Sequence, residues 1–244
     1  MKKQLFLVMA LILSLVLLDA CNFTVTSGSG KVISQARQVS GFTRFSLSGT
    51  GQLIIAQGDT ESLTIDAEDN VLPLITTQVI GDTLHIDYKN DNFQDNVIPT
   101  KPIIYHLGVK TINSIQLSGA GSVDAANLST DNLSVATSGA GSVNLRSIDA
   151  QTLTSDISGV GGCDLSGKVT DQAVNISGTG TYHGPDLESQ NATIVISGAG
   201  GVTVWAKRSL NVTISGAGSV NYYDNPTIVK TVTGIGSLVS QGNH

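Results

Sequence analysis

Apolar and polar residues alternate along most of this chain, and the alternation recurs in the same register about every 20 residues, a period typical of one structural unit that stacks repeatedly in space. A short phrase, Ser/Thr-Gly-x-Gly, aligns the units and sits at the same place in each. Its first glycines are Gly119, Gly139, Gly159, Gly178, Gly198, Gly216 and Gly234. The steps between them along the sequence are 20, 20, 19, 20, 18 and 18.

Three positions of each unit define its inner and outer faces. The residue before the phrase is almost always apolar: Leu117, Thr137, Ile157, Ile176, Ile196, Ile214 and Val232. So is the second residue after the second glycine: Val123, Val143, Cys163, Tyr182, Val202, Val220 and Leu238. The next position is mostly polar: Asp124, Asn144, Asp164, His183, Thr203, Asn221 and Val239. This pattern predicts stacked strands with one face in a shared core.

The phrase itself predicts a sharp corner in every unit. Glycine accepts a positive φ and allows close backbone approach, and a serine hydroxyl can bond a turn amide. We expect a bulky residue between the two glycines to collide with the next unit, which fits the Ala, Val, Thr and Ile found there. The fold class is therefore all-β, a β-solenoid (β-helix) of about 18–20-residue coils with S-G-x-G corners, each with about three short strands. A hairpin sandwich is the alternative.

Residues 1–21 predict a targeting segment. Lys2 and Lys3 precede an apolar run, Leu5–Leu18, which is short for a membrane span. The run ends near Ala20-Cys21, which resembles a bacterial lipobox with Cys21 as the lipid-attachment residue, although Asp19 departs from that pattern. Plain secretion and a retained anchor are the alternatives.

The remaining chain divides by composition. Residues 22–30 contain Ser-Gly-Ser-Gly and predict a flexible tether. Another copy of the corner phrase, at Ser48, precedes a loop rich in Asn, Asp and Pro. We therefore expect an N-terminal β region over residues 31–101 and a repetitive β-solenoid region over residues 102–244.

Charge and composition narrow the partners. The chain has 13 basic and 19 acidic residues, and without Lys2, Lys3 and Asp19 these become 11 and 18, a net charge of about −7. That balance disfavours nucleic acid or an anionic lipid surface as the main partner. Only two cysteines are present, so with Cys21 as the anchor Cys163 has no disulfide partner, and its apolar column predicts a buried thiol.

Few residues suggest chemistry. The four histidines lack metal-ligand spacing, and no cofactor or metal is expected. Asp124 and Asp164 share a column, but Asn144 lies between them, which disfavours a paired-carboxylate hydrolase. The candidate binding surface consists of three scarce aromatic residues, which could contact a sugar or protein or simply cap the last coils: Trp205, Tyr222 and Tyr223.

The arrangement over residues 35–240 resembles the DUF2807 family, described as the putative autotransporter adhesin, head GIN domain. The segments that carry the resemblance are Phe42–Gly51, Gln57–Asp59, Leu63–Asn70, Gly81–Leu84 and the L-S-G-A-G-S-V repeats. The resemblance implies a bacterial envelope protein with a β-helical body, and it brings no catalytic residues.

We therefore expect a non-enzymatic, extracytoplasmic, lipid-anchored β-solenoid that binds or displays a glycan or protein. The alternatives are an envelope structural or signalling accessory, whose partner is another envelope protein, and a polysaccharide-active enzyme.

Overall fold

The computed structural model describes residues 26–88 and 97–244, and nearly all of them lie in strands or in the turns between strands. The leader and Cys21 lie outside these residues. Within the two ranges the helical structure is a 3-10 turn, η1 (Leu72–Leu74). None of the described helical structure is long and apolar enough to cross a membrane.

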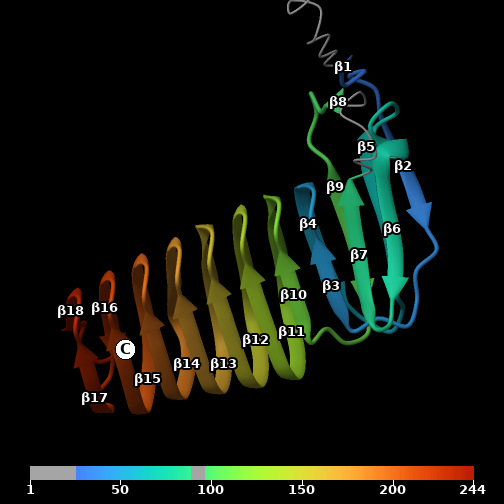
Figure 1. Cartoon of the computed structure of the whole chain (residues 1–244). Helices are drawn as coiled ribbons and strands as arrows, with labels where there is room; N and C mark the ends of the chain where they lie inside the picture. The colour runs from blue at the N-terminus through green and yellow to red at the C-terminus, as the bar shows by residue number, and fades with distance from the viewer. Residues whose placement is uncertain (1–25, 89–96) are drawn as a thin grey trace, which may run out of the picture.

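The repetitive region forms a stack of parallel coils (Figure 1). Its strands are β10 (Ser114–Leu117), β11 (Ala120–Thr137), β12 (Ala140–Ile157), β13 (Val160–Ile176), β14 (Thr179–Ile196), β15 (Ala199–Ile214), β16 (Ala217–Tyr223), β17 (Thr227–Val232) and β18 (Ile235–Ser240). This confirms the β-solenoid. In β11–β15 the expected short strands appear as one continuous strand per coil, which bends at corners and keeps its ladder of hydrogen bonds to the next coil. At the C-terminal end the coil is divided into the short strands β16 and β17, which both pair with β15.

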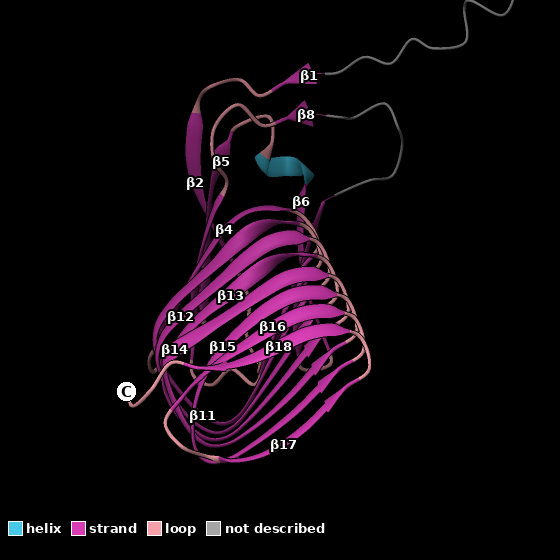
Figure 2. Cartoon of the chain, turned by 90° about the vertical axis from the view of Figure 1, so that its left-hand side faces the viewer, coloured by secondary structure: helices cyan, strands magenta, loops and turns pink. Residues whose placement is uncertain are grey.

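The sequence register is also the structural register. Val123 pairs with Val143, which pairs with Cys163, and the same column continues to Leu238 at the last coil. These side chains are buried as far as Val220, and Leu238 is partly buried. Figure 2 shows the coils superposed, so the apolar columns form one aliphatic core along the stack.

The corners need glycine because neighbouring coils approach closely there. A Cβ on Gly139 would overlap the carbonyl oxygen of Gly119, and one on Gly159 would overlap that of Gly139. The steric collision that we expected for the residue between the two glycines therefore concerns the glycines themselves. The residues between the two glycines point to solvent, and one of them, Val160, is 64% exposed. The Ser118 hydroxyl donates to the Leu47 carbonyl oxygen (3.3 Å) rather than to a turn amide.

The N-terminal region closes one end of the stack (Figure 1). Its strands are β1 (Thr26–Ser27), β2 (Val32–Arg37), β3 (Arg44–Leu47), β4 (Thr50–Gln57), β5 (Ser62–Glu68), β6 (Ile75–Ile80), β7 (Thr83–Tyr88), β8 (Val97–Ile98) and β9 (Ile104–Val109). β3 and β4 flank the Ser48 corner and pair in parallel with β10 and β11, so they form the first coil. β2, β5 and β6 add antiparallel strands, and the whole forms a 16-stranded sheet with the solenoid.

Hydrogen bonds hold residues 26–31, most of which fall within the expected tether. β1 pairs with β8. The carboxylate of Glu68 accepts from the backbone N–H groups of Gly30 (2.6 Å) and Thr100 (2.8 Å). The Asn70 amide donates to the Ser27 carbonyl oxygen (3.0 Å). Ser27–Lys31 is therefore docked onto the N-terminal end of the solenoid.

Candidate functional site

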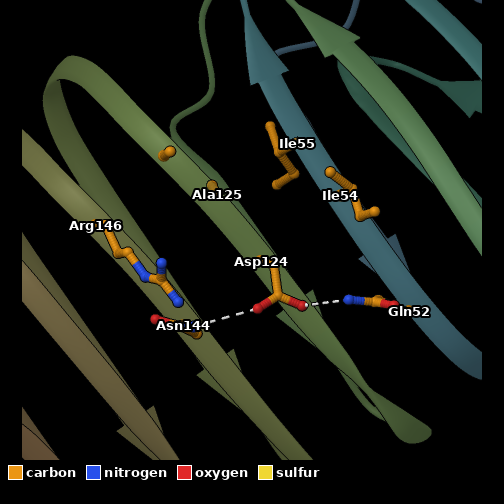
Figure 3. A pocket seen from close by; sticks show the side chains of 8 residues that line it. Gln52, Ile54, Ile55, Asp124, Ala125, Asn144 and Arg146 are labelled. Atoms are coloured by element: carbon orange, nitrogen blue, oxygen red, sulfur yellow. Dashed lines mark hydrogen bonds between the residues drawn. The ribbon is translucent and has the colours of Figure 1, made fainter.

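A shallow groove of about 340 Å³ lies on the outward face of β4, β11 and β12 (Figure 3). Polar and apolar side chains both contribute to it. The lining residues are Gln52, Ile54, Ile55, Asp124, Ala125, Ala126, Asn144 and Arg146.

Strand pairing brings these side chains together from distant parts of the chain. Ile54 pairs with Asp124, and Asp124 pairs with Asn144. Further along the same strands, the small Ala126 lies beside the exposed Arg146. Because alternate residues of a strand point to the same face, all of these side chains except those of Ile55 and Ala125 point outward. The small outward side chain of Ala126 leaves the hollow between Ile54 and Arg146.

The carboxylate of Asp124 is held in place from both sides. Its Oδ2 accepts from the Gln52 side-chain amide (3.0 Å), and its Oδ1 accepts from that of Asn144 (3.3 Å), as Figure 3 shows. Each amide uses an N–H here and keeps its carbonyl oxygen as an acceptor for a ligand. Arg146 adds guanidinium donors at the same groove. Fixed donors and acceptors beside an exposed isoleucine suit a ligand with several hydroxyl groups.

The predicted column of polar residues is present on this face. Asn144 lies between Asp124 and Asp164, as the sequence spacing indicates. The groove is lined by a single carboxylate, that of Asp124. Acid–base hydrolysis of a glycosidic bond usually employs two carboxylates, so the chemistry of the groove fits binding better than cleavage.

The three predicted aromatic residues do not share one surface. Tyr222 occupies an inward position, pairs with Val204 and packs against the core. Trp205 and Tyr223 pair with each other and are half-buried on the outward side. Their ring neighbour is His244, which no sequence motif singled out.

The thiol of Cys163 lies in the core, as predicted, and is 2% exposed. Burial raises the pKa of this thiol to about 11, so it is protonated at neutral pH and a poor nucleophile. Its Sγ accepts a hydrogen bond from the Ser155 hydroxyl (3.6 Å). Across residues 26–88 and 97–244, no cluster of three or more His, Cys, Asp or Glu side chains is placed to hold a metal ion.

Comparison with known proteins supplies a family. The family model of DUF2807, described as "Putative auto-transporter adhesin, head GIN domain", matches residues 41–226. No curated protein matches the chain.

Solved structures share the fold. A "putative adhesin" from Bacteroides fragilis NCTC 9343 is 27% identical with a TM-score of 0.82, covering 88% of this chain and 99% of that one. A "putative lipid binding protein" from Parabacteroides distasonis ATCC 8503 is 19% identical with a TM-score of 0.71, covering 89% and 99%. A "putative adhesin" from Parabacteroides merdae ATCC 43184 is 16% identical with a TM-score of 0.61, covering 88% and 98%. At these identities the two Parabacteroides structures support the fold alone.

Proposed function

The chain belongs to the DUF2807 family, and from that premise we propose that it is a non-enzymatic, adhesin-like module of the bacterial cell envelope that binds glycans. The observation that carries the proposal is the hydrogen-bonded row of Gln52, Asp124 and Asn144 beside Arg146. The family and the Bacteroides fragilis structure support an adhesin-like role. The choice of glycan as the target comes from the chemistry of the groove.

A glycan fits the groove better than a drug-like apolar ligand does. Small-molecule pockets are usually concave and mostly apolar, whereas this groove is shallow, and half of its lining residues are polar, with one carboxylate, two amides and a guanidinium. Sugars present hydroxyl groups that both donate and accept, so they match the carboxylate and guanidinium together. The groove is also open at the surface, as binding within a longer polysaccharide requires.

Attachment to a membrane through a lipid on Cys21 is part of the proposal. It rests on the Lys2-Lys3 start, the apolar run and the Ala20-Cys21 ending. Metabolic labelling with a palmitate analogue should mark the wild-type chain and leave Cys21→Ser unlabelled, and globomycin should block removal of the leader from the labelled wild-type chain. Equal labelling of both chains would overturn the lipid anchor.

Glycan binding is tested on arrays with the protein lacking its leader. Asp124→Ala and Arg146→Ala should each weaken binding about 10-fold or more, because hydrogen bonds to charged groups are worth roughly 1.5–3 kcal/mol. Asp164→Ala is the matched control, since it removes a carboxylate from the same column outside the groove lining. Binding that is equally weak in Asp164→Ala, or wild-type protein without array signal, contradicts the groove as a glycan site.

The same preparations separate the alternatives. Capture of one envelope protein from intact envelopes, without glycan binding, would favour an accessory role. Release of soluble products from polysaccharides would show an enzyme.

A further inference from the structure

A second surface is built where the coils lose their regular length. β14 and β15 fall out of register between Gly184 and Glu188, so β14 carries extra residues that β15 lacks. The extra segment contains Pro185 and the exposed Asp186. Bulges commonly re-aim side chains near functional sites. Here the register resumes on Trp205, which pairs with Glu188.

The indole ring of Trp205 is covered by another planar ring. The imidazole of His244 stacks on it with a centroid distance of 4.0 Å and an interplanar angle of 12°. Tyr223 meets the same imidazole edge-on at 5.2 Å and 78°. The imidazole of His244 thus contacts both aromatic rings and lies between Trp205 and Tyr223.

Polar groups surround this imidazole ring. The Trp205 indole N–H donates to Asp224 Oδ2 (2.6 Å), which lowers the pKa of the Asp224 carboxyl. His244 Nε2 lies 3.4 Å from Asp186 Oδ1 on the extra segment of β14. Lys207 Nζ lies 5.4 Å from the indole centroid and 3.2 Å from Glu188 Oε1. The space that His244 occupies is therefore apolar at its base and rich in acceptors at its rim.

We propose that Trp205 and Tyr223 form a binding site for a neutral sugar ring, and that His244 occupies this site in the ligand-free protein. A pyranose offers the same combination as the imidazole, an apolar face for the indole and an O–H donor for Asp186. Lys207 is already near Glu188, and Asp186 and Asp224 add negative charge, so the site disfavours acidic sugars. The ligand class rests on the proposed glycan binding, but the site shares no residue with the groove.

Packing alone does not account for these rings. Capping of the core at this level is supplied by Tyr222, whose ring faces inward. Trp205 and Tyr223 lie on the outward side, and although they are half-buried they are not among the side chains packed against this core. The residues before His244 are held by backbone bonds from Gln241 to Tyr222 (2.8 Å) and from Asp224 to Gly242 (2.8 Å), so the imidazole can leave while the coil stays paired.

Fluorescence tests the proposal directly, because Trp205 is the only tryptophan of the chain. His244→Ala should increase acrylamide quenching of Trp205, and His183→Ala, which removes an exposed histidine elsewhere on β14, should not. Titration with lactose or N,N′-diacetylchitobiose should shift the Trp205 emission.

The affinity for these neutral sugars should be about 2- to 12-fold higher in His244→Ala, the factor that a stacked aromatic pair is worth. Glucuronic acid serves as the acidic probe and should bind more weakly than the neutral sugars.

Two outcomes would overturn the proposal: unchanged quenching in His244→Ala, or greater quenching without any response to the sugars. Asp124→Ala identifies which site fails. It should weaken array binding in the groove and leave the Trp205 fluorescence response intact, so failure of one site is distinguishable from failure of the other.

Discussion

The regular coils β11–β13 and the C-terminal coils β14–β16 are built from the same phrase but are held together differently. In the regular coils the corner glycines Gly119 and Gly139 follow an even spacing, and valine and leucine fill most of the core. In the C-terminal coils the spacing shortens after Gly198, an extra segment projects at Pro185, and tyrosine enters the core. Repetition therefore sets the architecture, and departures from it create individual features.

A buried chain of hydrogen bonds, which begins at Tyr182, shows how such a departure is accommodated. The Tyr182 hydroxyl donates to Gln172 Oε1 (2.9 Å), and Gln172 Nε2 donates to Ser189 Oγ (2.7 Å). Ser189 Oγ in turn donates to the Trp205 carbonyl oxygen (2.8 Å). The large Tyr182 ring shares its coil with Ala192, a small residue in the column that Gln172 also occupies. Every polar group in this chain of bonds has a partner.

The largest effect is expected at the corners of the regular coils. Gly139→Ala places a methyl group onto the carbonyl oxygen of Gly119, and neither backbone can move without breaking the stack. We expect a loss of roughly 3 kcal/mol or more in the free energy of unfolding, at the upper end of overpacking costs. Urea unfolding measures it. Ala140→Ser, at the neighbouring exposed position, is the control and should change stability by less than about 0.5 kcal/mol. Similar losses in both variants would contradict the close-approach explanation.

A smaller effect is expected in the buried hydrogen-bond chain. Tyr182→Phe removes the donor to Gln172 and leaves a buried amide oxygen unpaired, at a cost of about 1–3 kcal/mol. Tyr223→Phe, on a half-buried ring outside the core, is the control and should be nearly neutral. Thermal unfolding of both variants compares them, and a neutral Tyr182→Phe would mean that the hydrogen-bond chain does not stabilise these coils.

The N-terminal segment Ser27–Lys31 is held differently from the regular coils. A carboxylate anchors the segment, whereas backbone hydrogen bonds and aliphatic contacts hold the coils together. The Thr100 hydroxyl and the backbone N–H groups of Thr100 and Gly30 lower the pKa of the Glu68 carboxyl below its ordinary 4.5. A carboxylate with a lowered folded-state pKa stabilises the fold fully above its unfolded pKa and loses that contribution as the pH falls through the folded pKa.

Acidification below about pH 4.5 should therefore release Ser27–Lys31 before the solenoid unfolds. The amide chemical shifts of Gly30 and Thr100 report this release, and that of Val143 reports the solenoid. In Glu68→Gln the acid-induced change at Gly30 should become much smaller, and what remains reports Asp69, whose carboxylate accepts from the Ser29 hydroxyl and lies 3.4 Å from Lys31 Nζ. Simultaneous transitions at Gly30 and Val143 in the wild-type protein would refute a separate release.

The smallest effect is expected at the junction between the regular and the C-terminal coils. Cys163 lies between Val143 and Tyr182 in the valine column, so Cys163→Val should change stability by less than about 1.5 kcal/mol, as volume-conserving core substitutions do. In the folded protein the raised pKa and burial of the thiol should also prevent labelling by Ellman's reagent at mildly alkaline pH. Rapid labelling of the native protein would contradict this placement.

Much of the fold was predictable, because each coil repeats the same constraints. The columns beginning at Leu117, Val123 and Asp124 follow the alternation, and the pairing of Thr50 with Ala120 follows from aligning the two corner phrases. The role of the glycines was only partly predictable, since close approach depends on the distance between coils and not on local conformation.

The candidate sites were harder to predict from the sequence than the fold was. The groove needs the small Ala126 beside Arg146 and the exposed Ile54, a combination that appears only when three strands are placed side by side. The partnership of His244 with Trp205 has no sequence signal, because a single histidine far from any motif does not indicate where its ring will pack.

Because every corner glycine packs against the same carbonyl group of the coil before it, whole coils can be added to this protein. A duplication of one whole coil between β12 and β13 would present the same glycines to the same carbonyl groups, so neither neighbour would need to change. Each duplication would add one strand spacing, about 4.8 Å, between the groove and the Trp205 site. Genetic insertion or loss of whole coils would thus change the distance between the groove and the Trp205 site in fixed increments.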